Sequence, residues 1–320
     1  SHANLVTNVL QMVEGMEITT ADTFVSWLPA FHDMGLILMT MVPLYLGARL
    51  VLLPTDLRRP ARWLEAMAAH RATFTAAPDF AYRMCLRYVR DPRQFDLTRL
   101  RVALNAAEPV RVKTVEDFER AFGLREVVTA GYGLAEATVG VSMSAPGRGI
   151  AADAKGHVSV GRPFPGIRVG ILGGDALAGP GDYGEILVRS PANTRGYFAN
   201  TDDTERLFWG DGFLRTGDVG YIDARGALTI AGRTKDVIKM AGRTIAPREV
   251  EEVVELVRGV RFSAAVGIEA GGIQGEQLWV VAEIRPQDIG ARDDRERTSV
   301  EVTDRLHRAL GARPARVLLA

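Results

Sequence analysis

Cysteine and histidine are scarce in this sequence. Its 320 residues include one cysteine, Cys85, and five histidines. One cysteine can form neither an internal disulfide nor a cysteine metal site, and the lack of a disulfide framework fits a reducing cytosol. We expect Cys85 to fill the core. The histidines lack the spacing of a zinc site, and we expect no structural metal.

Net charge and long apolar runs are scarce too. Lys plus Arg and Asp plus Glu both number 39, so no long-range field attracts nucleic acid or an anionic membrane. The longest uncharged apolar run, residues 34–48, contains Pro43 and is shorter than the ~20 residues of a membrane-spanning helix. We expect a cytoplasmic protein with no transmembrane segment and no nucleic-acid partner.

The ends of the chain lack the character of natural termini. The chain begins at Ser1 without an initiator Met and stops within the apolar run 317–320. Because natural termini are usually polar and exposed, we expect both ends to be cuts within a longer protein.

The first part of the chain alternates strands with helices, which predicts a mostly parallel sheet with helices on its faces. The predicted helices are 3–14, 34–46, 60–70, 79–90 and 110–122, and the predicted strands are 24–29, 49–54, 72–76, 100–105 and 127–130. We expect 34–46 and 49–54 to be buried.

The pattern changes after Gly147. Residues 156–232 are rich in glycine, proline and short strands (168–172, 184–189, 220–223 and 227–231), which predicts a small irregular β-barrel or sandwich. Beyond Arg233, helices at 247–258 and 298–310 and strands at 262–268 and 277–284 form an α+β pattern. We expect a boundary near 232–236, and three parts: 1–147, 148–234 and 235–320.

Two short motifs could carry chemistry. A carboxylate in a glycine turn, as in Thr216-Gly217-Asp218, can accept hydrogen bonds from a pair of sugar hydroxyls. An arginine at the end of a nearby strand, as in Gly232-Arg233, can hold a hydroxyl or phosphate oxygen. By itself, the first motif is more simply interpreted as a turn, and the second as part of a solvated loop.

The order of these and other motifs is specific. Residues 216–218, 232–236, 242 and 247–251 follow one another as in the adenylate-forming superfamily of acyl-CoA synthetases, fatty acyl-AMP ligases, luciferases and peptide-synthetase adenylation domains, which the sequence resembles over essentially its whole length. Three further segments match in order: 1–5, 105–110 and 131–136. The resemblance implies an α/β, adenylate-forming ligase fold, with a parallel α/β subdomain, a small β-barrel subdomain and a partial α+β C-terminal domain.

The resemblance also assigns roles near residue 132. Tyr132 would stack on adenine, and Gly131 and Gly133 would let the backbone approach the nucleotide. Glu136 matches the acid that binds Mg²⁺, a hard cation that suits oxygen ligands and bridges ATP phosphates. More simply, Tyr132 could be a core tyrosine, and Glu136 an exposed acid at the start of a helix.

Other roles follow in the same way. The segment containing Ala107, Glu108 and Pro109 would line the adenine and acyl pockets. Asp218 would bind the ribose, and Arg233 would reach the same sugar.

Two positions of the last part match family residues that act in domain movement. Lys235 occupies the position of the hinge between two conformations. Gly242 matches a glycine near the channel for the thiol arm of the acceptor.

Two segments indicate the fatty acyl-AMP ligase subgroup. Residues 132–138 look like that subgroup because Ala135 replaces the usual Thr or Ser before the acid, and Thr138 is a candidate to supply the missing hydroxyl. Residues 26–37 also resemble the subgroup and would place His32 between the acyl and nucleotide sites, although His32 could equally be a core residue. Against the subgroup, the stretch 139–161 is short.

The implied reaction activates a carboxylic acid with ATP and Mg²⁺ as acyl-AMP and passes the acyl group to a thiol. Glu136, His32 and Lys235 are the candidate catalytic residues. The thiol belongs to a carrier-protein phosphopantetheine in a fatty acyl-AMP ligase, or to CoA in an acyl-CoA synthetase. Two other interpretations are an inactive nucleotide- or acyl-binding fragment and, more weakly, a peptide-synthetase adenylation domain.

Two family features should lie outside the chain. The phosphate-binding loop should precede Ser1, and the lysine that contacts the reacting carboxylate should follow Ala320. Because losing one electrostatic contact typically costs about 10²–10³ in rate, we expect little or no adenylation activity from these residues alone.

Overall fold

A computed structural model of the chain describes residues 1–320 except 57, 235–237, 241–242, 270–275 and 285–291. Its internal contacts divide it into two compact units. The first comprises Ser1–Thr216 and Gly220–Ile230, and the second comprises Gly217–Val219 and Ala231–Ala320.

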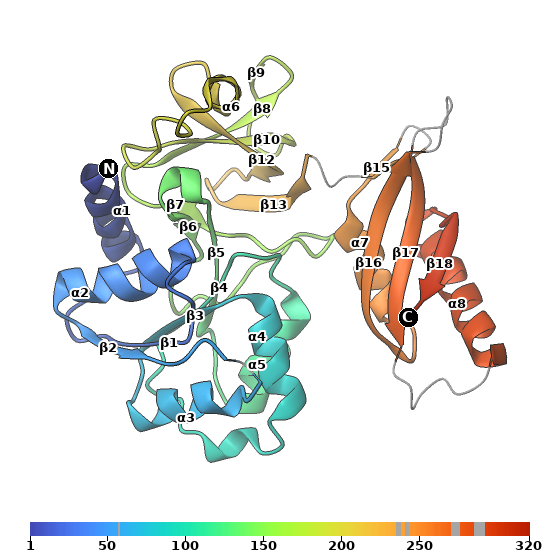
Figure 1. Cartoon of the computed structure of the whole chain (residues 1–320), viewed down its shortest axis with the longest axis horizontal. Coiled ribbons are helices and arrows are strands. Elements are labelled where there is room, and N and C mark those ends of the chain that lie inside the picture. The colour runs from blue at the N-terminus through green and yellow to red at the C-terminus, as the bar shows by residue number, and fades with distance from the viewer. Residues whose placement is uncertain (57, 235–237, 241–242, 270–275, 285–291) are drawn as a thin grey trace. The chain divides into compact units, whose positions relative to one another are not determined.

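The first unit is built on a seven-stranded sheet of order β2-β1-β3-β4-β5-β6-β7 (Figure 1). The first five strands of this order pair in parallel, and the last two pair antiparallel. The bounds are β1 Thr23–Ser26, β2 Arg49–Leu52, β3 Phe74–Ala77, β4 Val102–Asn105, β5 Val128–Gly133, β6 Gly140–Met143 and β7 Arg162–Pro163. The predicted mostly parallel sheet is confirmed.

Strand β2 corrects one expectation. The segment 49–54 was expected to be buried, but β2 lies at the edge of the sheet and Leu52 is 58% exposed. An edge strand is covered on fewer sides than a central one, so apolar composition alone overestimated its burial.

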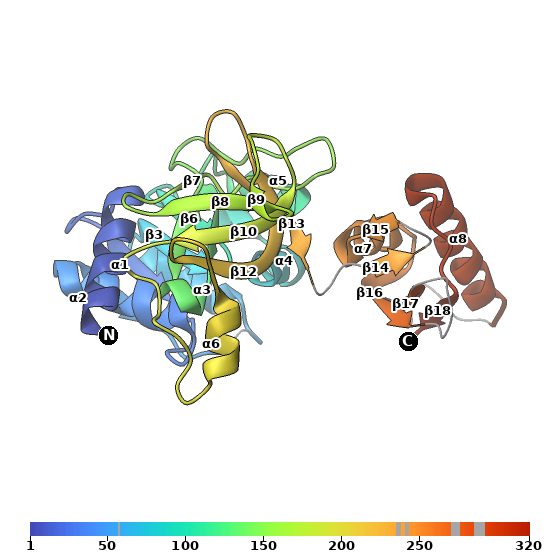
Figure 2. The same cartoon turned by 90° about the horizontal axis from the view of Figure 1, so that it is seen from above.

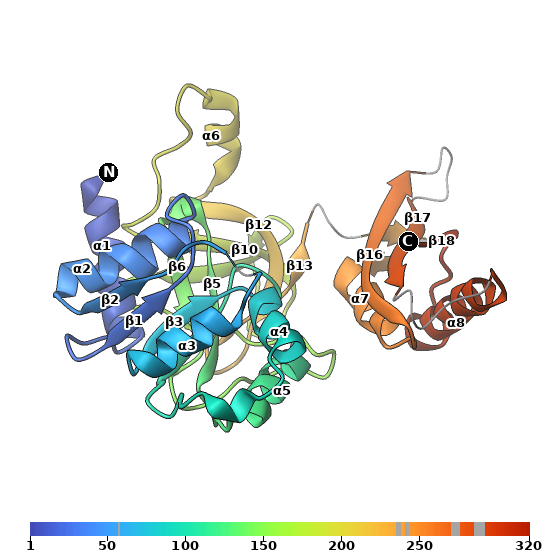
Figure 3. The same cartoon turned by 60° about the horizontal axis from the view of Figure 1, so that its bottom comes forward.

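Helices flank this sheet, and α4 and α5 lie side by side (Figures 1 and 3). Their bounds are α1 His2–Gly15, α2 Val42–Leu46, α3 Ala61–Ala69, α4 Asp79–Tyr88 and α5 Val112–Phe122, with 3₁₀ turns η2 Pro92–Gln94 and η3 Ala135–Ala137.

The helix predicted at 34–46 is interrupted. It consists of a π-helix, η1 Met34–Met41, followed by α2. The Val42 N–H donates to the carbonyl of Ile37, five residues back, and Pro43 has no N–H to continue an α-helical ladder. Such wide turns are uncommon and recur at functional sites.

Aromatic rings and small apolar residues fill the core. Phe24 stacks on Phe74 with ring centroids 4.7 Å apart, and Trp63 meets Tyr82 edge-on at 5.5 Å. Cys85 is fully buried, as expected of a core residue, and burial raises the pKa of its thiol to about 12.

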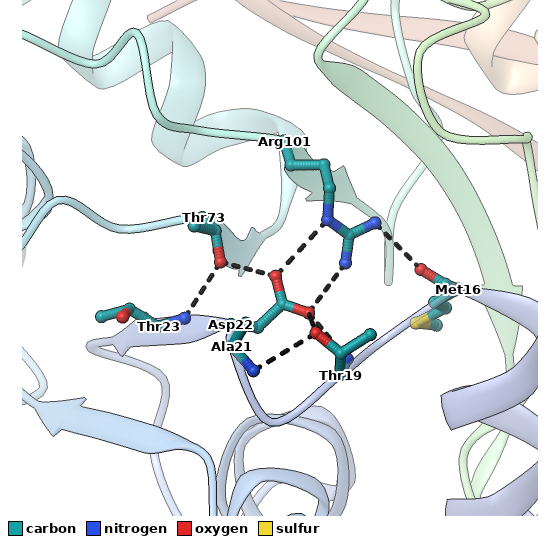
Figure 4. Close-up of polar contacts among 7 residues, drawn as sticks. All are labelled: Met16, Thr19, Ala21, Asp22, Thr23, Thr73 and Arg101. Atoms are coloured by element: carbon teal, nitrogen blue, oxygen red, sulfur yellow. Dashed lines mark hydrogen bonds and ion pairs between the residues drawn. The ribbon is translucent and has the colours of Figure 1, made fainter.

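At the edge of the sheet formed by the amino ends of its strands (the amino edge), a carboxylate with both oxygens hydrogen-bonded joins several elements (Figure 4). Asp22 is 5% exposed and accepts hydrogen bonds from the Thr73 hydroxyl at 2.6 Å and the Thr19 N–H at 2.8 Å. Its Oδ2 pairs with Nη2 of Arg101 at 3.0 Å, and Nη1 of Arg101 donates to the Met16 carbonyl at 3.2 Å. Asp22 and Arg101 together thereby join the end of α1 to the starts of β1, β3 and β4.

The short strands predicted after residue 156 form a six-stranded sheet of order β11-β12-β10-β8-β9, with β13 paired to β12. Helix α6 and the loop before it project from this sheet (Figure 3). The bounds are β8 Arg168–Gly173, β9 Ala176–Leu177, β10 Gly184–Arg189, α6 Thr201–Leu207, β11 Phe208–Trp209, β12 Phe213–Ile222 and β13 Leu228–Arg233.

The second unit is α+β, as predicted. Strands β16, β17 and β18 form a sheet, and α7 and α8 pack against its buried face, which includes Leu278 and Val280 (Figure 2). The bounds are β14 Ile238–Met240, β15 Arg243–Ile245, α7 Pro247–Glu255, β16 Val260–Glu269, β17 Glu276–Ile284, α8 Arg292–Leu310 and β18 Arg316–Leu319. Within the described residues, no helix is long and apolar enough to cross a membrane.

Candidate active site

Most of the predicted site residues of the first unit follow parallel strands directly. His32 lies after β1, Ala107 to Pro109 after β4, and Gly131 to Glu136 at the end of β5 and just beyond. The carboxyl ends of parallel strands lie at one edge of a sheet, and ligands of open α/β sheets bind there. The topology therefore places these segments along the same edge.

A buried aspartate that the sequence analysis missed supports the loop after β4. Asp79 is 1% exposed and accepts hydrogen bonds from Nδ2 of Asn105 at 3.0 Å, the Arg111 N–H at 3.3 Å and the Thr114 hydroxyl at 3.2 Å. It also pairs with Nε of Arg83 at 3.2 Å. These contacts hold both ends of the loop 105–111. Asp79 had a sequence signal, since an acid at the first residue of a predicted helix often anchors neighbouring backbone.

The middle of that loop is exposed and strained. Ala107 has a φ of +69°, a conformation that non-glycine residues rarely adopt. Glu108 is half-buried and accepts a hydrogen bond from the Phe80 N–H. Burial raises the pKa of Glu108, the Phe80 bond opposes that rise, and the nearby charge of Asp79 adds to it.

The packing of the chain itself requires a glycine at one of the two positions beside Tyr132. A Cβ on Gly133 would lie 1.6 Å from the Val139 carbonyl oxygen, whereas one on Gly131 would lie 2.7 Å from Cδ1 of Leu104, the end of a side chain that can shift. Backbone packing therefore explains Gly133 without a nucleotide. The predicted close approach to a nucleotide stays a prediction, as does the stacking role of the half-buried Tyr132.

Glu136 is half-buried in the turn η3, and a second segment clamps it. Its carbonyl accepts a hydrogen bond from the Thr194 N–H at 2.7 Å, and its Oε1 accepts one from the Tyr197 hydroxyl at 2.7 Å. The bond to Glu136, aided by burial, raises the pKa of Tyr197 to about 12. Tyr197 was not predicted from the sequence, where its only signal is an aromatic pair, Tyr197-Phe198, that follows Gly196 in a polar loop.

Thr138 does not present its hydroxyl as a substitute for the one that Ala135 lacks. The residue is 9% exposed, and its Oγ1 donates to the Ala192 carbonyl at 2.7 Å. The hydroxyl therefore fastens the turn to the loop after β10.

An open groove of about 790 Å³ runs beside this turn. Its wall is formed by α1 (Asn4, Leu5), η1 (Ile37), the Glu136 turn (Ala135, Thr138) and residues 194–201. An open, partly polar groove bordered by a half-buried carboxylate suits a charged ligand better than a wholly apolar one.

His32 is exposed rather than packed in the core. Its side chain is 48% exposed, and its Nδ1 lies 3.0 Å from Oδ1 of Asp33 and 3.2 Å from the Met34 N–H. The structure therefore excludes the core interpretation, and the predicted position between acyl and nucleotide sites stays a prediction.

In the second unit, Asp218 and Arg233 form an ion pair, and their predicted roles at a ribose stay predictions. Asp218 is 6% exposed, and its Oδ1 pairs with Nε of Arg233 at 3.0 Å, while the Arg233 side chain is 68% exposed. Lys235 and Gly242 lie outside the described residues, and their roles stay predictions.

The described residues fit a weakly held Mg²⁺ ion better than a tightly caged metal. They contain no group of three or more His, Cys, Asp or Glu side chains arranged to hold a metal. Mg²⁺ is commonly held by one or two carboxylates together with its waters and substrate phosphates. Glu136 could supply such a carboxylate.

Comparison with known proteins identifies the family. Residues 1–198 match the AMP-binding enzyme family. The chain belongs to that family. The match covers the whole of the parallel sheet and the Glu136 turn, so the predicted superfamily is confirmed.

Relatives within the AMP-binding family are ligases by name. The chain is 35% identical over 327 residues to the medium-chain-fatty-acid–acyl-carrier-protein ligase JamA of Moorena producens, covering 89% of this chain and 55% of that protein. It is 34% identical over 319 residues to the putative ligase Rv1013 of Mycobacterium tuberculosis, covering 88% of this chain and 57% of that protein. The chain thus spans little more than half the length of these relatives.

A solved structure confirms the adenylate-forming fold. A chain from a study of fatty acyl-adenylate ligases from E. coli and L. pneumophila superposes with a TM-score of 0.89 at 26% identity, covering 100% of this chain and 62% of that one. The predicted α/β fold class therefore holds for this member of the AMP-binding enzyme family.

Proposed function

We propose that this chain belongs to a ligase that activates a fatty carboxylic acid with ATP as acyl-AMP, releasing pyrophosphate, and then transfers the acyl group to a carrier-protein phosphopantetheine thiol. The observation that carries the proposal is the half-buried Glu136 carboxylate, clamped at the carboxyl edge of the sheet beside an open groove. At this position, Glu136 would hold the cation that neutralises the charge of the ATP phosphates.

The remaining residues would bind and orient the substrates. Tyr132 would stack on adenine, with Gly131 and Gly133 beside it. The segment Ala107 to Pro109, fastened by Asp79, would border the adenine and acyl pockets. Holding reactants in one geometry supplies much of the catalysis in such reactions.

In the second unit, Asp218 would accept hydrogen bonds from the ribose hydroxyls, with Arg233 reaching the same sugar. His32, exposed after β1, would lie near the reacting carboxylate. Lys235 would act as the hinge, and Gly242 would lie by the thiol channel. The division of the chain into parts 1–147, 148–234 and 235–320 belongs to the same proposal.

Binding tests the nucleotide assignment directly. A hydrolysis-resistant mimic, dodecanoyl-sulfamoyl-adenosine, is titrated calorimetrically into the chain, where we expect saturable binding. Stacking on an aromatic ring contributes about 1–3 kcal/mol per base, so Tyr132→Ala should weaken binding roughly tenfold or more. Tyr45→Ala, at an exposed position on α2, is the control. No binding of the mimic to the folded chain would overturn the proposal.

The acceptor requires a separate test. The name of the relative JamA favours a carrier protein, and other relatives include a putative acyl-CoA synthetase. With acyl-AMP supplied, we expect transfer to a phosphopantetheinylated carrier protein to outpace transfer to CoA. Rapid acyl-CoA formation would favour the CoA-dependent reaction.

A further inference from the structure

The loop between β10 and α6 is fastened to the turn that carries Glu136. The Thr194 N–H donates to the Glu136 carbonyl at 2.7 Å, and the Thr138 hydroxyl donates to the Ala192 carbonyl at 2.7 Å. These two bonds, one at Glu136 itself and one two residues beyond it, hold turn and loop at a fixed separation. A group on the loop can therefore hold the Glu136 side chain in one orientation.

Tyr197 is that group, and its own backbone is restrained. The Tyr197 N–H donates to Oγ1 of Thr204 on α6 at 2.9 Å. The preceding Gly196 has a φ of +141°, and a Cβ there would lie 2.4 Å from Cγ2 of Thr204. The Tyr197 hydroxyl donates to Oε1 of Glu136 at 2.7 Å, so a restrained residue holds the carboxylate.

The two carboxylate oxygens of Glu136 are consequently unequal. Oε1 is occupied by the Tyr197 hydroxyl, whereas no described residue donates a hydrogen bond to Oε2. A cation that meets this carboxylate finds one oxygen to which no described residue donates and one that is shared with the Tyr197 hydroxyl. Ca²⁺ accepts carboxylates through one or both oxygens, whereas Mg²⁺ keeps an octahedral shell of waters and phosphate oxygens around few carboxylate ligands.

We propose that Tyr197 is a positioning residue that limits Glu136 to one-oxygen cation binding and thereby favours Mg²⁺ over Ca²⁺ at the nucleotide phosphates. This inference rests on the proposed function, which makes Glu136 the cation-binding acid. Tyr197 touches the carboxylate and acts through it.

The test measures cation preference in binding. ATP is titrated calorimetrically into the chain with Mg²⁺ or with Ca²⁺, and the ratio of the two dissociation constants is compared between proteins. The Tyr197→Phe variant keeps the ring and removes the hydroxyl from a side chain that is 41% exposed, so the fold should be retained. Tyr45→Phe, 53% exposed, is the matched control, and Glu136→Gln reports whether the carboxylate binds the cation at all.

We expect Tyr197→Phe to shift the ratio about tenfold toward Ca²⁺, equivalent to about 1.4 kcal/mol, mainly because Ca²⁺ can then engage both oxygens. Tyr45→Phe should leave the ratio unchanged, and Glu136→Gln should weaken the binding of ATP with either cation. A ratio within twofold of the wild type in Tyr197→Phe, with Glu136→Gln still weakening binding, would overturn this inference and leave the proposed function standing. If Glu136→Gln leaves the binding of ATP unchanged with either cation, the cation role of Glu136 fails and this inference fails with it.

Discussion

The two edges of the seven-stranded sheet hold their carboxylates differently. At the amino edge, both oxygens of Asp22 are occupied by the Thr73 hydroxyl, the Thr19 N–H and Arg101. At the carboxyl edge, Glu136 has one oxygen engaged by Tyr197, and Glu108 takes one backbone N–H. A fully paired buried carboxylate holds structure together, whereas a partly paired one retains capacity for a ligand.

Asp79 lies at the carboxyl edge, and yet both of its carboxylate oxygens have partners. Its partners are the groups that hold the loop 105–111. We therefore assign it to support of the site rather than to ligand binding. Structural carboxylates therefore differ from the candidate functional ones in having partners for both oxygens, and not in position alone.

The largest effect should come from Asp79→Ala. This change strips the acceptor from Nδ2 of Asn105, which is fully buried, and removes the carboxylate that pairs with Nε of Arg83. Breaking a buried pair commonly costs about 3–5 kcal/mol, and we expect about 3 kcal/mol because Arg83 is 27% exposed. Urea unfolding measures the loss.

The matched control for that change is Asp117→Ala on the neighbouring α5. Asp117 pairs with Lys113 and Arg120 at the surface, where such pairs contribute about 0–1 kcal/mol. Asp79→Ala should also weaken binding of the acyl-adenylate mimic because the loop loses its anchor. Equal losses of stability in the two variants would contradict the supporting role of Asp79.

Asp22→Asn should have the next largest effect. It removes the charge opposite Arg101, whose side chain is 33% exposed, so we expect a loss of about 2 kcal/mol, below the range for a fully buried pair. Where the variant is folded, mimic affinity should match the wild type. Asp175→Asn, at an exposed position of the first unit, is the control. A tenfold loss of affinity in Asp22→Asn would refute the separation of the two edges.

The contribution of Asp22 should vanish in acid. Burial opposes ionisation of Asp22, but the bonds from Thr73, Thr19 and Arg101 outweigh it and lower its pKa. A carboxyl whose pKa is lower in the folded state stabilises the fold above its unfolded pKa and loses that contribution as pH falls through the folded pKa. The stability difference between wild type and Asp22→Asn should therefore shrink below about pH 4. A pH-independent difference in urea unfolding would contradict this linkage.

Sequence reasoning found what periodicity and short local motifs encode. The alternating strands and helices gave the parallel sheet, and the segment 131–136 gave the Glu136 turn at its carboxyl edge. Both depend on residues close together in the chain. The helix at 34–46 was predicted, but its π-helical part η1 was missed because apolar spacing predicts a helix without distinguishing bonds to the fourth from bonds to the fifth residue back. The strand at 49–54 was also predicted, but the exposure of β2 was missed because edge position depends on strands distant in sequence.

The same reason explains the missed site residues. Tyr197 lies 61 positions from Glu136, and Asp79 lies 32 positions from Arg111. No local pattern joins such pairs, because only the fold brings them within hydrogen-bonding distance. The Thr138 hydroxyl shows the converse, since it is near Glu136 in sequence and is engaged by Ala192.

The smallest effect should come from Glu108→Gln, and its pH dependence should be opposite to that of Asp22. Burial raises the pKa of Glu108 above its usual value, so the folded state holds a proton more tightly than the unfolded state does. Stability of the wild type should then fall as pH rises through that interval. Glutamine keeps an acceptor for the Phe80 N–H without a charge. The variant should therefore be more stable than the wild type near pH 7, by less than about 1 kcal/mol. At low pH, where the carboxyl is protonated in both states, the free energies of unfolding of the two proteins should be equal.

The control is Glu116→Gln, at an exposed position on α5, where we expect no such difference from the wild type. If Glu108→Gln were less stable than the wild type at pH 7, the charge of Glu108 would support the fold, as that of Asp22 does.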